Sequence, residues 1–173
     1  MPLALMLLLL LVVLVGGVIT SLLTGPVAIP ADKVFHVLFW IVDAGPGGDV
    51  EVEIVRNLRL PQVILAILVG AALAQSGAAM QGFFQNPMAD PFIIGVSSGA
   101  ALGATVAVFL SLDIWIFGIN AVAGFAFVGA VLVTFLVYAL SARGGRVPVT
   151  TVLLTGIAVG SLSTAVTSFL MIS

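Results

Sequence analysis

The stretch at residues 56–104, RNLRLPQVILAILVGAALAQSGAAMQGFFQNPMADPFIIGVSSGAALGA, decides the fold. Two apolar runs, rich in Gly, Ala and Ser, flank a short polar segment at 85–91. Arg56 and Arg59 stand just before the first run. A run of about 20 apolar residues is long enough for an α-helix to cross a bilayer. The stretch therefore predicts two membrane-spanning helices joined by a tight polar turn.

The whole chain is too apolar for an ordinary soluble domain. Its 173 residues are 62% hydrophobic and 7% charged, with a mean hydropathy of +1.37. Soluble domains carry about 25% charged residues. Because lipid offers no hydrogen bonds, a spanning backbone must satisfy its own polar groups, which favours helices. We therefore expect an all-α, polytopic membrane helix bundle, with one transmembrane domain over residues 1–173.

Five stretches are long and apolar enough to span a membrane, at roughly 3–23, 61–84, 92–112, 114–140 and 149–171. The fourth is longer than a perpendicular span needs, so it must tilt or begin with an interfacial turn. The first could instead be a signal peptide. It lacks a positively charged leading region and a clear small-residue cleavage site, so we expect a retained helix.

The longest polar segment, residues 24–60, is expected to form an external loop between the first two spans. Its residues 30–41 predict a short amphipathic helix at the membrane surface, broken by the Gly-Pro-Gly-Gly run at 45–48. His36 lies in this helix and is expected to be solvated rather than a ligand. Acidic residues alternate with apolar ones over 49–54, which predicts a brief extended lead-in to the second span.

Composition also excludes several functions. The chain has no cysteine and one histidine, so neither a disulfide nor a metal site is expected. The net charge is −2 and no basic run marks nucleic-acid binding. No G-x-x-x-x-G-K-[ST] motif can cradle a nucleotide, and no cofactor is expected. The middles of the spans hold no ionisable residue, which argues against a proton- or sodium-coupled carrier.

Small and polar residues inside the spans indicate a compact bundle. Glycines at helical spacing let helix backbones approach closely, as a channel would also require. Those expected to pack helices are Gly70, Gly95, Gly99, Gly103, Gly156 and Gly160. Hydroxyls and amides in lipid need protein or water partners. They are Gln75, Ser76, Gln81, Ser97, Ser98, Thr155, Ser161, Ser163, Thr164, Thr167 and Ser168.

The order and spacing of motifs resemble the permease subunits of the ABC importers for iron-siderophores, haem and vitamin B12. The matching elements are R-x-x-R-L-P at 56–61, Gln81 with N-P-M-A-D-P at 86–91, and G-V-S-S-G-A at 95–100. A weaker likeness to a later helix of the family lies at 154–160.

The resemblance implies a transport permease rather than an enzyme. Permeases of this family are roughly twice as long, with about ten spanning helices, so this chain is expected to be the N-terminal half. The implied partners are a second permease copy in a homodimer, two cytoplasmic ATPase subunits and an external substrate-binding protein. Transport would proceed by alternating access. The substrate stays open among siderophore, haem, cobalamin and oxyanion. A secondary transporter half and a non-catalytic membrane subunit are the remaining alternatives.

Topology follows from the resemblance, because the balanced basic residues in the loops leave the positive-inside rule undecided. It implies a multi-pass protein of the cell membrane with a cytoplasmic N-terminus. The 24–60 segment would lie outside, and the segments 85–91 and 141–148 inside.

Two basic side chains at the external mouth are expected to dock the binding protein. Arg56 and Arg59 are three residues apart, so on an α-helix they would share a face. Guanidinium groups suit bidentate capture of carboxylates, and the resemblance implies acidic residues on the partner. The alternative is that both arginines only anchor the helix end among lipid phosphates.

The turn at 85–91 carries a second candidate site. Each proline keeps the residue before it out of the right-handed helical region, so Asn86 and Asp90 are expected to be turn or cap residues, whose side chains can satisfy backbone groups at the facing helix ends. The turn could be no more than a rigid cap. Under the sharper hypothesis it joins the start of the fifth span in a cytoplasmic gate. The gate residues would be Asn86, Pro87, Met88, Asp90, Pro91, Thr150 and Thr151.

Overall fold

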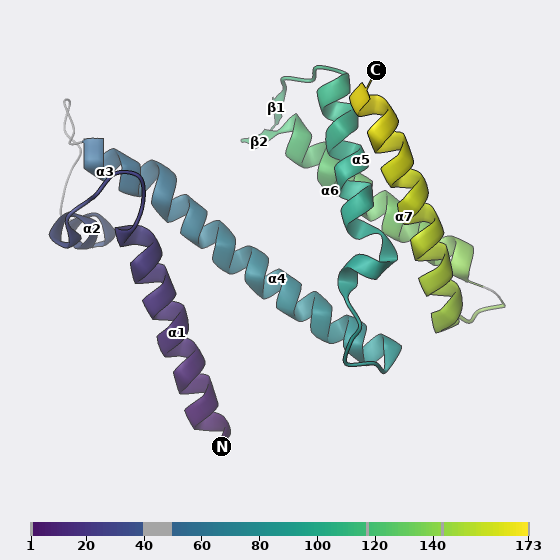
Figure 1. Ribbon diagram of the computed structural model, residues 1–173, viewed down its shortest axis with the longest axis horizontal. Coiled ribbons are helices and arrows are strands. Elements are labelled where there is room, and N and C mark those ends of the chain that lie inside the picture. Colours follow the sequence, from purple (N-terminus) through teal and green to yellow (C-terminus); the bar gives the residue numbers. More distant parts are fainter. Residues whose placement is uncertain (1, 40–49, 117, 143, 173) are drawn as a thin grey trace. The chain divides into compact units, whose positions relative to one another are not determined.

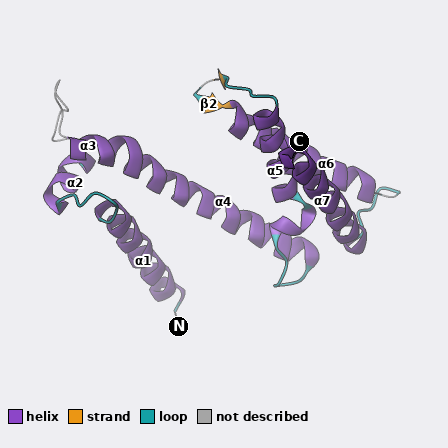
Figure 2. Cartoon of the chain, turned by 45° about the horizontal axis from the view of Figure 1, so that its top comes forward, coloured by secondary structure: helices purple, strands orange, loops and turns teal. Residues whose placement is uncertain are grey.

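The computed structural model describes residues 2–39, 50–116, 118–142 and 144–172. Contacts divide the chain into two units, Met1–Ala72 and Leu73–Ser173, each described by itself below. The elements appear in Figures 1 and 2. They are α1 (Leu3–Leu23), α2 (Ala31–Leu38), α3 (Val50–Ile54), the π-helix η1 (Val55–Arg59), α4 (Leu60–Phe84), the 3₁₀-helix η2 (Pro91–Ile94), α5 (Val96–Phe109), β1 (Trp115–Ile116), β2 (Ile119–Asn120), α6 (Ala121–Ser141) and α7 (Val149–Ile172).

The first unit has a small core at the C-terminal end of α1, where α2, α3 and η1 gather (Figure 1). Its buried members are Leu22, Ile29, Val34, Val55 and Val63. The predicted short helix is confirmed as α2, which buries one apolar face in this core, whereas its place at the membrane surface stays a prediction. The break at 45–48 lies outside the described residues.

The predicted extended lead-in at 49–54 is wrong, because residues 50–54 are helical and run without a break into η1 and α4. In a strand, Val50 and Val52 would face the same side. In the structure Val52 is 4% exposed and Val50 is 67% exposed. Burial of Val52 and an ion pair from Lys33 of α2 to Glu51 favour the helix over the strand that the alternation suggests.

Four helices in the described parts of the chain are long and apolar enough to cross a membrane. They are α1, the continuous helix Val50–Phe84, α6 and α7. The all-α, multi-pass membrane class is therefore confirmed. The third predicted span is wrong in extent, because α5 has only 14 residues.

Two local breaks explain why α5 and α6 are shorter than the third and fourth predicted spans. Gly95 adopts a left-handed φ of 83°, which separates η2 from α5. Trp115–Ile116 pairs antiparallel with Ile119–Asn120. As a result α6 begins only at Ala121, where the Asn120 side chain accepts a hydrogen bond from the Val122 N–H at 2.8 Å.

In the second unit, α5 packs against α6 and α7 at positions that only glycine can fill. An added Cβ at Gly99 would lie 2.6 Å from the Gly129 carbonyl oxygen of α6. One at Gly103 would overlap the Phe125 carbonyl, and one at Gly156 would lie 2.6 Å from the Ile93 carbonyl oxygen.

The other three glycines expected to pack helices have more space, because a Cβ built at any of them meets no atom closer than 3.3 Å. Gly160 faces the Ser98 hydroxyl, with 3.3 Å between its built Cβ and that oxygen. Gly95 serves the turn before α5, and its built Cβ also approaches Val133. Nothing among the described residues lies within 4 Å of a Cβ added at Gly70.

Candidate functional site

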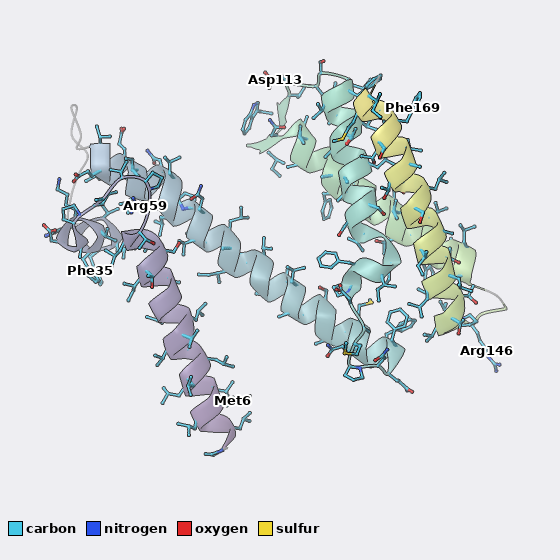
Figure 3. The ribbon with its side chains drawn as sticks, viewed as in Figure 1. Met6, Phe35, Arg59, Asp113, Arg146 and Phe169 are labelled. Carbon is cyan, nitrogen blue, oxygen red and sulfur yellow. The ribbon has the colours of Figure 1, made fainter. Side chains whose placement is uncertain are left out.

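Arg59 is a buried basic residue in the first unit, with 7% of its surface exposed (Figure 3). Its Nη1 donates a hydrogen bond to the Leu22 carbonyl oxygen at 2.6 Å, and its Nη2 donates to the Val27 carbonyl oxygen. Leu22 lies in the last turn of α1, where carbonyl groups lack partners within the helix. A cation is favoured at this negative end of the helix dipole. Arg59, the last residue of η1, therefore caps α1.

The two arginines do not share an exposed face. Arg56 is exposed, whereas Arg59 points into the core of the first unit. Both lie in η1, a π-helix whose i→i+5 hydrogen bonds widen the turn. A wider turn separates residues three positions apart more than an α-helix does. The expected shared face is therefore wrong, and the docking role of the pair stays a prediction.

The turn at 85–91 is held by its own polar side chains. The Asn86 Oδ1 accepts from the Met88 N–H at 2.9 Å, and the Asp90 Oδ1 accepts from the Phe92 N–H at 2.8 Å. The Gln81 amide donates to the Pro87 carbonyl oxygen at 3.0 Å. Asp90 thus caps η2, and Asn86 closes the turn without capping a described helix.

This turn projects one apolar side chain, since Met88 is 84% exposed. Thr150 is exposed and Thr151 is half-buried at the start of α7. The turn leads into η2, which packs on α7, and Ile94 shares a buried cluster with Val152. The two segments assigned to the gate are thus neighbours in the second unit. Their gating role stays a prediction.

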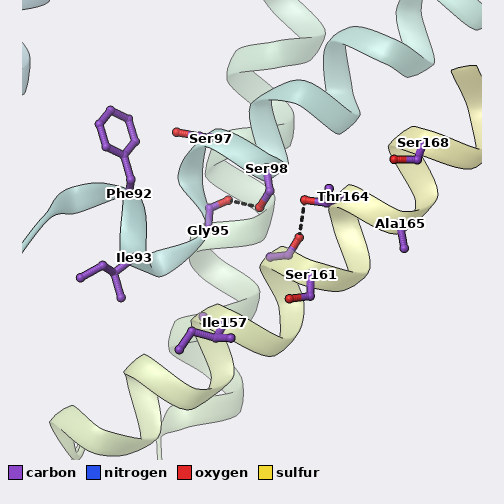
Figure 4. Close-up of a pocket in the computed structure, with 12 residues that line it drawn as sticks. Phe92, Ile93, Gly95, Ser97, Ser98, Ile157, Ser161, Thr164, Ala165 and Ser168 are labelled. Atoms are coloured by element: carbon purple, nitrogen blue, oxygen red, sulfur yellow. Dashed lines mark hydrogen bonds between the residues drawn. The ribbon is translucent and has the colours of Figure 1, made fainter.

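An open groove of about 810 Å³ lies along α5, η2 and α7 (Figure 4). Five hydroxyl side chains line it: Ser97, Ser98, Ser161, Thr164 and Ser168. None of its twelve lining residues, all within the described parts, carries a charge. The groove is uncharged, and its five hydroxyls stand among a mainly apolar lining.

Two of these hydroxyls have their protons engaged. The Ser98 Oγ donates to the Gly95 carbonyl oxygen at 2.8 Å, and the Thr164 Oγ1 donates to the Gly160 carbonyl oxygen at 2.9 Å (Figure 4). A hydroxyl has one proton and two lone pairs. These two side chains therefore offer hydrogen-bond acceptors to the groove.

Sequence reasoning noted these hydroxyls as polar residues in lipid but did not join them into a site. The signal was present on α7, where Ser161, Thr164 and Ser168 are spaced by three and four residues. Such spacing places side chains on one helical face. The contribution of Ser97 and Ser98 depends on how α5 packs against α7, which spacing along one segment does not reveal.

Residues 8–173 match the FecCD transport family. The chain is 50% identical over 120 residues to the cobalamin import system permease protein of Halobacterium salinarum, covering 69% of this chain and 31% of that relative. It is 39% identical over 168 residues to an uncharacterized ABC transporter permease of Bacillus subtilis, covering 90% and 45%. The hemin transport system permease protein of Yersinia pestis is 44% identical over 108 residues, covering 61% and 32%. The chain spans less than half the length of these relatives.

Proposed function

Because this chain belongs to the FecCD transport family, we propose that it forms part of the permease subunit of an ATP-driven importer for metal chelates. The observation that carries the proposal is the hydroxyl-lined groove of α5, η2 and α7. Ser98 and Thr164 bond main-chain carbonyls, and the other three hydroxyls would find partners in a water-filled path through the assembled protein. The groove then contributes one wall of the translocation path.

The remaining wall would come from further permease helices and from a second copy in a homodimer. The absence of charge from the groove fits a path that is not driven by an ion gradient. Two cytoplasmic ATPase subunits would supply the energy, and alternating access would move the cargo. No covalent chemistry is assigned to this chain.

The proposed orientation has a cytoplasmic N-terminus. Arg56 then lies outside the membrane, where its exposed guanidinium suits acidic residues on a substrate-binding protein. In this orientation the turn at 85–91, with Thr150 and Thr151, would form the cytoplasmic gate, and the exposed Met88 side chain would act in it.

Between haem and cobalamin cargo, we propose a corrinoid. Ser98 and Thr164 offer acceptors, which complement amide N–H donors. The carboxylates of haem have only acceptors when ionised and gain nothing from these two groups. The similarity to a relative named as a cobalamin permease points the same way.

The test is uptake by the full-length transporter, reconstituted in proteoliposomes with its ATPase subunits and binding protein. Thr164→Val removes a groove hydroxyl, whereas Thr167→Val removes a hydroxyl outside the groove that also bonds a carbonyl four residues earlier. We expect ATP-dependent uptake of cyanocobalamin that falls several-fold in Thr164→Val and persists in Thr167→Val.

Three results would count against the proposal. Uptake that needs a proton or sodium gradient in the presence of ATP would indicate a secondary transporter. No uptake of any chelate with functional ATPase subunits would indicate a non-catalytic subunit. Equal uptake by the two threonine variants would remove the groove from the path.

A further inference from the structure

We propose that Arg59 is a positioning residue, which holds the external end of α1 and the loop after it against the helical turn that presents Arg56. The inference rests on the proposed docking role of Arg56. It assigns the two arginines different tasks, one facing the partner and one fixing the surface that the partner meets.

The first observation is how the charge of Arg59 is satisfied. Its described hydrogen bonds go to two main-chain carbonyls, those of Leu22 and Val27, rather than to a carboxylate. A buried cation is costly unless it is hydrogen-bonded and electrostatically compensated. The end of α1 supplies both, through an orphan carbonyl and the negative pole of the helix. A guanidinium used in this way is withdrawn from an external partner.

The second observation is the space that the loop leaves for this side chain. A Cβ added at Gly25 would lie 2.7 Å from Nη2 of Arg59 and 3.0 Å from its Cζ. Gly25 is not among the described glycines with positive φ, so its backbone conformation does not require glycine. A side chain at this position would compete with the guanidinium for the same space.

The third observation concerns what Arg59 holds in place. Val55, the residue before Arg56, is fully buried in the same core as Leu22. The exposed Arg56 is thus flanked along η1 by two inward-pointing anchors, Val55 and Arg59. Loss of one anchor lets the turn and the loop move relative to each other, and Arg56 loses its fixed direction.

Positioning and direct docking predict different outcomes for conservative changes. Lysine keeps the charge of Arg59 but has one ammonium group, which lacks the planar fork that bonds two separate carbonyls. Gly25→Ala keeps both arginines and displaces only the guanidinium. Gly16→Ala is the matched control, because nothing described lies within 4 Å of a Cβ built there.

The experiment uses the full-length transporter with its ATPase subunits in lipid nanodiscs. Two quantities are measured for each variant: affinity for the binding protein across a salt series, and amide hydrogen exchange over residues 22–30 without the binding protein. We expect Arg59→Lys and Gly25→Ala each to weaken binding roughly tenfold, which is about 1.4 kcal/mol. The salt dependence should stay that of the wild type, exchange should quicken, and Gly16→Ala should match the wild type in both quantities.

Two results would overturn the inference. If Arg59→Lys binds as the wild type does while Arg59→Gln binds weakly with a reduced salt dependence, Arg59 is a docking charge. If Arg59→Lys and Gly25→Ala both show faster amide exchange but bind the binding protein with unchanged affinity, the hydrogen bonds of Arg59 do not position Arg56. A wild type that fails to associate with the binding protein would instead refute the docking role of Arg56. In that case the amide hydrogen exchange of residues 22–30 alone decides whether Arg59 holds the loop in place.

Discussion

Gly99 marks a close approach of α5 to α6 in the second unit, and adding one carbon there is a quantitative test of the packing. The Cβ of Gly99→Ala would lie 2.6 Å from the Gly129 carbonyl oxygen and 2.7 Å from the Val133 Cβ. Ordinary van der Waals contact begins near 3.4 Å. The first contact is with backbone, which cannot rotate away, so α5 and α6 must separate by several tenths of an ångström.

Overpacking of a well-packed core costs typically about 1–3 kcal/mol, and a backbone clash places Gly99→Ala in the upper half of that range. At about 2–4 °C per kcal/mol for a protein of this size, the melting temperature in detergent should fall by roughly 4–12 °C. Gly124→Ala on α6 is the control, since nothing described lies within 4 Å of its built Cβ. The full-length protein is followed by thermal unfolding in one detergent. Equal melting of Gly99→Ala and Gly124→Ala would refute the close approach.

Three further outcomes are expected. Asn86→Ala removes the side-chain acceptor for the Met88 N–H and should lower stability by about 1 kcal/mol, seen as earlier thermal unfolding; no change would mean that the turn does not depend on this bond. Ser141→Ala removes a fully buried hydroxyl without a described partner, so we expect thermal unfolding at the same or a higher temperature. A marked loss of stability would reveal a hydrogen bond that the structure does not show. In a background without native cysteine, Asp32→Cys should react with an impermeant thiol reagent on intact cells, and Arg146→Cys should react only after permeabilisation. The reverse pattern would invert the proposed topology.

The parts of the fold that follow from the sequence are those fixed by local periodicity. The apolar runs at 3–23 and 149–171 become α1 and α7 almost residue for residue, because nothing within them competes with helix formation. The short amphipathic pattern at 30–41 becomes α2 for the same reason. Membrane class and helical architecture depend on these long patterns and are well determined.

The structure differs from the predictions where a single residue, or a contact distant in the chain, determines the local conformation. The left-handed turn at Gly95 shortens α5, although the apolar run continues on both sides of it. The alternating residues at 50–54 become helical, and there Val52 is buried and Glu51 pairs with Lys33 of α2. Such contacts leave no mark in the local pattern.

The features of the candidate sites also fall into two groups, those that the local sequence predicts and those that depend on contacts distant in the chain. The turn role of Asn86 and the cap role of Asp90 follow from proline chemistry and neighbouring residues, and both bonds are seen in the structure. The burial of Arg59 depends on Leu22 and Val27, which are 37 and 32 residues away in the chain. A spacing rule for an α-helix also does not apply to a π-helical turn.

The most direct test of the account is whether water and cargo reach the groove of α5, η2 and α7 in the working transporter. Ser161→Cys lines the groove, whereas its neighbour Leu162→Cys does not, although the Leu162 side chain is 66% exposed in the isolated chain. In proteoliposomes with the ATPase subunits and binding protein, we expect a water-soluble thiol reagent to modify Ser161→Cys at a rate that changes with ATP. That modification should block cyanocobalamin uptake, and Leu162→Cys should stay unmodified and active. An unreactive Ser161→Cys, or equal modification of both variants without loss of uptake, would contradict the assignment of this groove to the translocation path.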